Sequence, residues 1–161
     1  METKAQITLT EFFCRNLGFR KFVVVEAEGN VEGLALMWKE EINILLEWEN
    51  SRIIYCHLKG LKPSTNWMLY SCYGPPTLET GLFLNSLYDS IFYDSNPWLI
   101  IGDLNKLVDD SEKFGGRRIA RKKSFLTNFI NKARGIDLGF SGRCYTWENK
   151  HDTTSLIKKN V

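Results

Sequence analysis

The succession of short apolar runs and longer helical patterns predicts a mixed α/β (α+β) domain built of stacked layers. Several strand-like runs precede the first long helical pattern after residue 18, and helices then alternate with strands. A simple doubly wound sheet would alternate the two throughout. The chain has 161 residues and shows no internal repeat, linker or low-complexity segment. A chain of this length forms a core that buries roughly 70% of its unfolded surface, so we expect one domain over residues 1–161.

The first half of the chain predicts one helix followed by a series of strands. Residues 1–4 leave no room for an element before the helix expected over residues 6–17, which Gly18 ends. The helix is indicated by apolar residues near helical spacing, namely Ile7, Leu9, Phe12, Phe13 and Leu17. Strands are indicated by β-branched and apolar content and are expected at 22–27, 33–38, 42–48, 52–58 and 67–73. The intervening segments are a turn at 28–30, a hairpin turn at 49–51 and a loop at 59–64.

After Pro76 the apolar residues fall at helical intervals, which predicts a helix over 78–93 that Asn96-Pro97 prevents from continuing. The wholly apolar run 98–101 is too short for a helix and predicts a strand buried on both faces. A polar loop with two adjacent glycines is expected at 107–117. A further helix over 124–133, ended by Gly135, carries Phe125, Leu126, Phe129 and Ile130 on one face. Short strand-like pieces are expected at 137–140 and 144–147, and another begins within 153–161.

Two polar side chains follow the apolar strand in the segment NPWLIIGDLNK, residues 96–106. Period-two alternation places Asp103 and Asn105 on the same side of the chain just past the strand end, while Leu104 turns back to the core. A carboxylate can take a proton or bind a metal, and an amide can hold an anionic oxygen. The alternative is an Asx-turn in which both side chains cap local backbone.

Composition and charge give no global indication of a nucleic-acid or membrane partner. The 21 basic and 19 acidic residues leave a net charge of +2. No apolar run reaches the roughly 18 residues of a membrane span, and no signal peptide is recognised. The four cysteines are widely spaced without a CxxC pair, so we interpret them as reduced apolar residues of an intracellular protein. His57 lies in a strand-like stretch and is interpreted as a hydrogen-bonded structural histidine.

One segment is locally basic. Six cations and no anion fall within eleven residues: Lys113, Arg117, Arg118, Arg121, Lys122 and Lys123. Those next to the helix that begins near Ser124 oppose its dipole by roughly 0.3–1 kcal/mol each. That local cost favours a patch that contacts nucleic-acid phosphates, with a solvated charged loop as the alternative.

The blocks of this sequence, taken in order, resemble the endonuclease/exonuclease/phosphatase superfamily of Mg²⁺-dependent phosphodiesterases. Within it, the sequence is most similar to the endonuclease domain of plant LINE-type (non-LTR) retrotransposons. Seven matching blocks follow the family's order: METK at 1–4, GLALMW at 33–38, YGP at 73–75, PWLIIGDLN at 97–105, EKFGG at 112–116, IDLGF at 136–140 and YTW at 145–147. The resemblance implies two packed β-sheets flanked by helices, a four-layer sandwich.

The resemblance also implies roles for four residues. Glu2 matches a metal-binding glutamate, Tyr73 an active-site tyrosine, Asp103 the aspartate that orients or deprotonates water, and Asn105 the asparagine that contacts the scissile phosphate. The implied cofactor is Mg²⁺, with Mn²⁺ as a possible substitute. A hard divalent cation prefers carboxylate oxygen. The alternatives are a disordered surface glutamate for Glu2 and a packing role for Tyr73, while Trp147 either fills core or lines the edge of the site.

The departures from the family pattern predict a truncated domain whose sheets lack terminal strands. Only Met1 precedes Glu2, and the family's final aspartate strand and serine-aspartate-histidine motif have no match. Because catalytic residues act as a unit, we expect little nuclease activity. The implied partners are DNA and, in the parent element, a reverse transcriptase domain, with the nucleus as the place of action. The alternatives are a non-catalytic nucleic-acid-binding remnant and a phosphoesterase of the same fold acting on a small phosphoester.

Overall fold

The computed structural model describes residues 2–3, 6–27, 33–60, 66–76, 79–108, 110–116, 124–139, 141–142, 145–149 and 156–159. These ranges contain three α-helices and three β-sheets, so the predicted mixed α+β class is confirmed. Contacts divide the chain into two compact units. The first comprises Met1–Tyr73 and Ser95–Asp103, and the second Gly74–Asp94 and Leu104–Val161.

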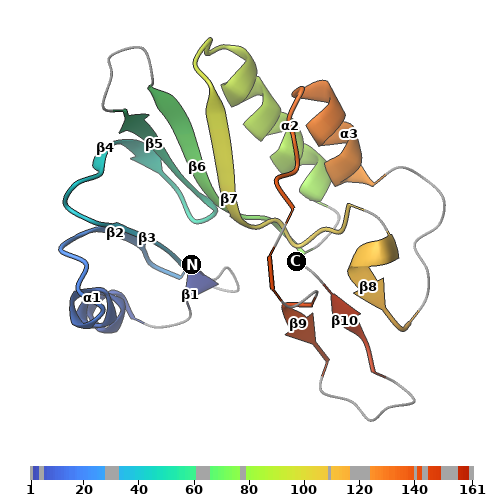
Figure 1. The fold of residues 1–161 in the computed structure, drawn as a ribbon, viewed down its shortest axis with the longest axis horizontal. Coiled ribbons are helices and arrows are strands. Elements are labelled where there is room, and N and C mark those ends of the chain that lie inside the picture. The colour runs from blue at the N-terminus through green and yellow to red at the C-terminus, as the bar shows by residue number, and fades with distance from the viewer. Residues whose placement is uncertain are drawn as a thin grey trace. The chain divides into compact units, whose positions relative to one another are not determined.

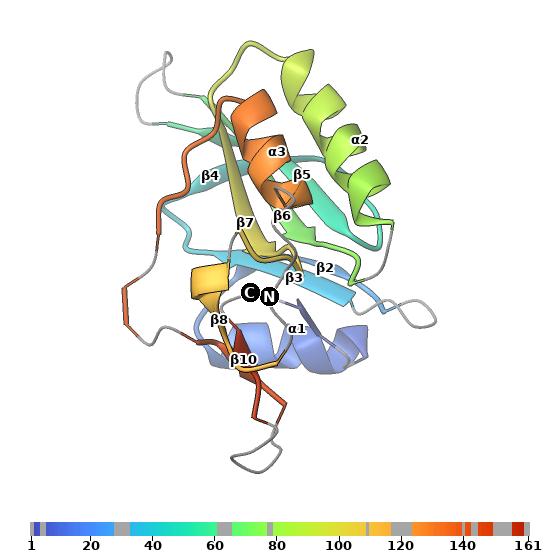
Figure 2. The same cartoon turned by 90° about the vertical axis from the view of Figure 1, so that its right-hand side faces the viewer.

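The first unit has three layers, with a helix on one face of a three-stranded sheet and a four-stranded sheet on the other (Figure 1; Figure 2). The antiparallel three-stranded sheet has the order β1-β3-β2, and the four-stranded sheet has the order β4-β5-β6-β7, with only β6 and β7 parallel. The elements are α1 (Ile7–Asn16), β1 (Glu2–Thr3), β2 (Lys21–Val25), β3 (Gly33–Trp38), β4 (Asn43–Glu49), β5 (Ile53–Lys59), β6 (Trp67–Tyr73) and β7 (Trp98–Asp103).

The core of this unit lies between the two sheets. We call it the inner cluster, and its buried members are Leu34, Leu36, Ile54, Cys56 and Leu69. Alternate residues of β3 and β5 supply four of them, as period-two side-chain alternation requires. The β4–β5 hairpin that aligns the larger sheet turns at Asn50, whose side-chain oxygen accepts the backbone N–H groups of Arg52 and Ile53 at 2.8 and 2.9 Å. The predicted hairpin and the implied pair of packed sheets are therefore both present.

The helix over 6–17 is confirmed, and Gly18 follows it with a positive φ of 85°. Its apolar residues, however, do not form the buried face. Leu9, Phe12, Phe13 and Leu17 are exposed, whereas Thr10 and Cys14 are buried. The small side chains of Thr10 and Cys14 suit a helix that lies close against a sheet. The face of α1 that turns toward the sheet is therefore the one with small side chains and not the one with the most apolar side chains.

Two expectations for strands were wrong. Residues 2–3 do form an element, because β3 supplies the hydrogen-bonding partner that so short a strand lacks on its own. The run 98–101 is also not buried on both faces, since Ile101 is 39% exposed. Among the described residues β7 is the last strand of its sheet. The three-stranded sheet contacts β5 and β6, so the far end of β7 extends past this cover.

The second unit pairs two helices and contains a small separate sheet. Phe125 of α3 lies so near α2 that a Cβ added at Gly81 would come 3.5 Å from its ring, and Figure 1 shows the two helices side by side. Ser124 caps α3 by accepting the N–H of Thr127 at 3.0 Å. The elements are α2 (Thr80–Phe92), the 3₁₀ turn η1 (Asp110–Glu112), β8 (Lys113–Phe114), α3 (Phe125–Lys132), β9 (Trp147–Glu148) and β10 (Lys158–Lys159), with the sheet order β8-β10-β9.

Details of the second unit differ from expectation. The loop 107–117 contains η1 and β8, because its two glycines let β8 approach β10: a Cβ at Gly115 would lie 2.2 Å from the carbonyl oxygen of Leu156. After α3 the left-handed residue is Arg134, not Gly135. Of the face predicted for α3, Leu126 and Phe129 are buried and Phe125 is exposed. Residues 137–139 are not strand, whereas the pieces near 147 and 158 are.

The remaining expectations concern cysteines, histidine and membranes. Cys14, Cys56 and Cys72 are buried free thiols, as predicted, while Cys144 and the 28–30 turn lie outside the described residues. His57 is hydrogen-bonded through Nε2 to the Tyr55 hydroxyl at 2.8 Å, which confirms its structural interpretation. None of the helices in the described ranges combines the length and apolar character that a bilayer crossing requires.

Candidate active site

The predicted catalytic residues Tyr73 and Asp103 are direct neighbours in the first unit. They end β6 and β7, two parallel strands, and the register pairs Tyr73 with Asp103. Parallel strands bring their carboxyl ends to the same edge of a sheet, which is where ligands bind in open α/β sheets. Both side chains are half-buried. A phenol and a carboxylate separated by 30 residues of sequence thus stand side by side on rigid backbone.

Gly102 makes this pairing possible. It lies opposite Cys72, has a φ of +127°, and a Cβ there would come 2.0 Å from the Cys72 carbonyl oxygen. No L side chain fits that backbone conformation and that space. The glycine of the GDLN segment therefore lets β7 remain against β6 up to its last residue, which is Asp103.

Tyr73 combines a packing role with a position at the strand end. Its side chain packs against the inner cluster, and its backbone N–H donates to the Arg52 carbonyl at 2.8 Å. Tyr73 therefore does have the packing role that was given as the alternative. It does not compete with a role in binding, because a ring fixed by packing holds its hydroxyl in one place.

Arg52 is the residue at this edge that sequence reasoning missed. The register that pairs Ile53 with Cys72 continues by one step to place Arg52 opposite Tyr73. Its Nη1 atom is buried and has no hydrogen-bond partner within the described part of the chain. A buried donor without a partner costs about 1–3 kcal/mol, which an anion bound there would recover. The sequence feature that could have indicated Arg52 is an arginine directly before an apolar strand.

Glu2 reaches the same unit through backbone pairing. β1 pairs antiparallel with β3 and sets Glu2 opposite Leu34, a member of the inner cluster. The backbone of position 2 thus lies beside β3, and its side chain is outside the described atoms. Mg²⁺ is bound in proteins through one or two carboxylates and several waters, so the carboxylates at positions 2 and 103 suit that ion in kind. The side chains that are described include no group of three or more His, Cys, Asp or Glu placed to hold a metal.

Asn105 belongs to the second unit. It adopts a positive φ of 53°, which asparagine tolerates better than most residues. Its Nδ2 donates to the Gly74 carbonyl at 2.8 Å, 31 residues away in sequence. A Cβ at Gly74 would come 2.3 Å from the Leu104 carbonyl oxygen, so Gly74 allows the two segments to approach. The Nδ2 group of Asn105 thus ties together segments that are distant in the sequence.

The predicted phosphate-contacting patch is described only in part. Lys113 lies in β8 of the second unit, while Arg117, Arg118, Arg121, Lys122 and Lys123 fall outside the described residues. Trp147 is 45% exposed in β9, so the interpretation that it fills core is wrong.

The buried thiols of the larger sheet are unreactive at neutral pH. Burial raises the pKa of Cys72 to about 12 and, with help from Glu49 and Glu47, raises the pKa of Cys56 to about 11. A thiolate is the reactive form of cysteine. Neither residue is therefore a nucleophile at neutral pH, and the chemistry of this edge rests on oxygen and nitrogen groups.

The sequence matches no protein-family model, and no curated protein matches it either.

Proposed function

We propose that this chain is a Mg²⁺-dependent phosphodiesterase domain that cleaves DNA, derived from a LINE-type retrotransposon endonuclease. The observation that carries the proposal is the register pairing of Tyr73 with Asp103 at the carboxyl ends of β6 and β7. The sequence blocks of the endonuclease/exonuclease/phosphatase superfamily assign active-site roles to these two residues, and the strand register brings them together independently.

Each residue of the edge has a task in phosphodiester hydrolysis. The Asp103 carboxylate accepts a proton from the attacking water, and the Tyr73 hydroxyl donates a hydrogen bond to a non-bridging phosphate oxygen. Arg52, with its buried Nη1, holds a second phosphate oxygen as a charge-assisted donor. For Asn105, which belongs to the second unit, the resemblance implies an amide contact to a phosphate.

The carboxylate at position 2 is the group that would hold Mg²⁺ or Mn²⁺. When bound, the ion neutralises charge on the phosphate. Activity of this chain is expected to be low, because catalytic residues act as a unit and its sequence contains no serine-aspartate-histidine motif. A functional parent element would pair this activity with a reverse transcriptase domain and act in the nucleus.

A plasmid-nicking assay tests the proposal. We expect slow conversion of supercoiled to nicked DNA with Mg²⁺ or Mn²⁺ and none in EDTA. Asp103→Asn keeps the shape of the side chain but removes its basicity, so it should lower the rate by about 10²–10⁴-fold. Asp89→Asn, an exposed aspartate of α2, is the matched control and should leave the rate unchanged.

Substitution of Arg52 provides a second, independent test of the proposal. Arg52→Lys keeps one positive charge but loses the planar donor set, so it should raise the substrate concentration required for half-maximal rate. Nicking that persists in EDTA, or that is equal in Asp103→Asn and wild type, would contradict the proposal. Salt-sensitive DNA binding without any cleavage would instead favour the non-catalytic alternative.

A further inference from the structure

Three residues of the candidate active site form a row across the end of the larger sheet. The register pairs Tyr73 of β6 with Asp103 of β7, and the N–H of Tyr73 donates to the carbonyl of Arg52 at 2.8 Å. Neighbouring strands of a sheet are only about 4.8 Å apart, so paired residues lie side by side. We call Arg52, Tyr73 and Asp103 the edge row, in which Tyr73 stands between the other two.

Arg52 is the member of the edge row that lies outside a strand. β5 begins at Ile53, and Arg52 belongs to the turn that joins β4 to β5. The carbonyl of Arg52 is tied to β6 through Tyr73. The other half of the residue, its N–H group, must be fixed by contacts within the turn, because hydrogen bonds between strands hold only the residues of the ladder.

Asn50 supplies these contacts. Its side-chain oxygen accepts the N–H of Arg52 at 2.8 Å and the N–H of Ile53 at 2.9 Å. The backbone N–H of Asn50 also donates to the Ile53 carbonyl at 2.9 Å. A single amide side chain therefore holds both the turn residue and the first residue of β5.

The side chain that this turn presents is the one whose placement matters for an anion. The Nη1 atom of Arg52 is buried and has no hydrogen-bond partner within the described residues. Arginine binds phosphate through a planar fork of N–H groups, so its orientation matters as well as its charge. A donor that is already held in its bound orientation binds more tightly, because it loses less freedom when the ligand arrives. Fixing the backbone of Arg52 is therefore a way to improve phosphate binding without contact to the phosphate.

We propose that Asn50 is a positioning residue of the candidate active site, because its side-chain oxygen fixes the turn from which Arg52 holds a phosphate oxygen. Asn50 acts through Arg52. The inference rests on the proposed function for the role of Arg52, but its test is separate, because phosphate binding is measured in EDTA without any cleavage.

The first experiment is a titration with inorganic phosphate in EDTA, followed through the NMR signals of arginine side chains. The signal that disappears in Arg52→Lys belongs to Arg52. Asn50→Ala removes both acceptor contacts and should weaken phosphate binding at Arg52 by about tenfold. Asn50→Ser keeps a side-chain oxygen without adding charge. Because a hydroxyl makes this turn contact more weakly than an amide, its affinity should lie between those of wild type and Asn50→Ala.

Two further variants guard against a general loss of structure. Asn50→Gly removes the acceptor but keeps a residue that favours turns, so its hairpin should form and its phosphate binding should fall as in Asn50→Ala. Asn43→Ala is the matched control, because it makes the same substitution at the other end of β4, where Asn43 pairs with Lys59. It should leave phosphate binding unchanged.

A double-mutant cycle tests whether Asn50 acts through Arg52. The quantity measured is the affinity for a labelled duplex oligonucleotide in EDTA, by fluorescence anisotropy. Arg52→Ala and Asn50→Ala should each weaken binding. Their combination should be within about twofold of Arg52→Ala alone, because the group that Asn50 orients is then absent.

The outcomes separate this inference from the proposed function. Weaker phosphate binding in both Asn50→Ala and Asn50→Gly would support the inference even if the wild-type protein nicks no plasmid, a result that contradicts only the phosphodiesterase proposal. Phosphate affinity equal to wild type in these two variants would overturn the inference. Additive losses in the cycle would overturn it too, since Asn50 would then act independently of Arg52. An Arg52 signal in wild type that does not respond to phosphate would overturn both the inference and the anion-binding role of Arg52.

Discussion

The four-stranded sheet of the first unit and the three-stranded sheet β8-β10-β9 of the second are specified in different ways. Strands of the first are six or seven residues long, and its inner face is closed by the inner cluster. Strands of the second are two residues long and contain three lysines among six residues. Burial fixes the first sheet, while a few hydrogen bonds and two glycines fix the second.

This difference determines which kind of site each of the two sheets can support. The edge that carries Tyr73 and Asp103 stands on a buried sheet, so small displacements there cost packing energy, and the geometry is suited to chemistry. The small sheet has strands of two residues, and none of their six side chains is buried, so small displacements there cost little packing energy.

The largest effect expected is at Gly102. Gly102→Ala places a Cβ against the Cys72 carbonyl at a φ that alanine rarely adopts, and should lower the free energy of unfolding by about 2–4 kcal/mol. Urea denaturation measures it. Gly18→Ala, also at positive φ but with nothing within 4 Å of the added Cβ, should cost only about 1 kcal/mol. Equal losses in the two variants would refute the close contact between β6 and β7.

An effect of similar size at its upper limit is the response of the larger sheet to alkaline pH. Because the pKa of Cys72 is raised to about 12 by burial, the folded protein retains a proton that the unfolded chain releases near pH 9. The contribution of this thiol to the free energy of unfolding should therefore be constant below pH 9. Between pH 9 and 12 it should fall by about 1.4 kcal/mol per pH unit. Comparing urea midpoints of wild type and Cys72→Ala over this range isolates the contribution, and parallel curves would contradict it.

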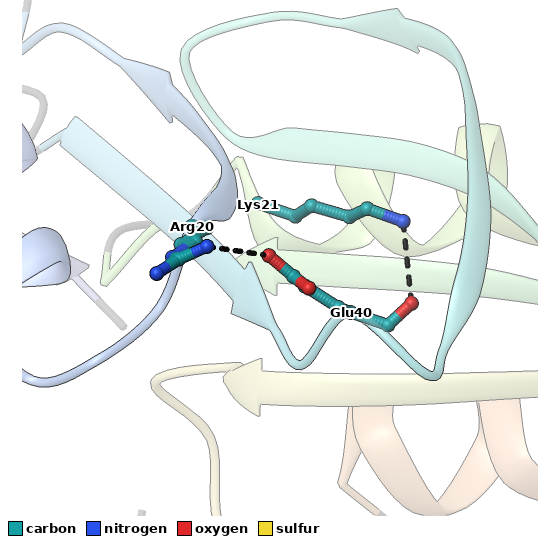
Figure 3. A network of polar contacts seen from close by, with 3 residues as sticks. All are labelled: Arg20, Lys21 and Glu40. Atoms are coloured by element: carbon teal, nitrogen blue, oxygen red, sulfur yellow. Dashed lines mark hydrogen bonds and ion pairs between the residues drawn. The ribbon is translucent and has the colours of Figure 1, made fainter.

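The smallest effect concerns the polar network near the end of β3. Arg20 and Glu40 form an ion pair at 3.6 Å, and Lys21 donates to the Glu40 carbonyl at 3.3 Å (Figure 3). The Arg20 and Glu40 side chains are 83% and 60% exposed, so solvent screens the pair. A double-mutant cycle with Arg20→Ala and Glu40→Ala should give a coupling within about 0.3 kcal/mol of zero. A coupling above about 1 kcal/mol would show that surface charge contributes to this sheet as burial does.

Local sequence patterns were sufficient to predict most of the strands and helices. The bounds of β3 and β6 agree with their apolar runs, and Asn50 turns the hairpin as its side chain favours. Local signals failed where the outcome depended on a partner. A two-residue β1 forms only because β3 pairs with it, and the apolar run in β7 is partly exposed because the smaller sheet does not cover all of it.

The sequence by itself determined which groups are available: a carboxylate and an amide after a strand, a tyrosine before a glycine, and a basic segment near Lys113. Only the tertiary structure decided that Tyr73 stands beside Asp103, that Arg52 lies opposite Tyr73 with a buried Nη1, and that Lys113 faces Lys159 and not Lys158. The physical reason is register. Side-chain periodicity fixes which residues share a face of one strand, whereas the residue across from each is chosen by long-range pairing that no local pattern encodes.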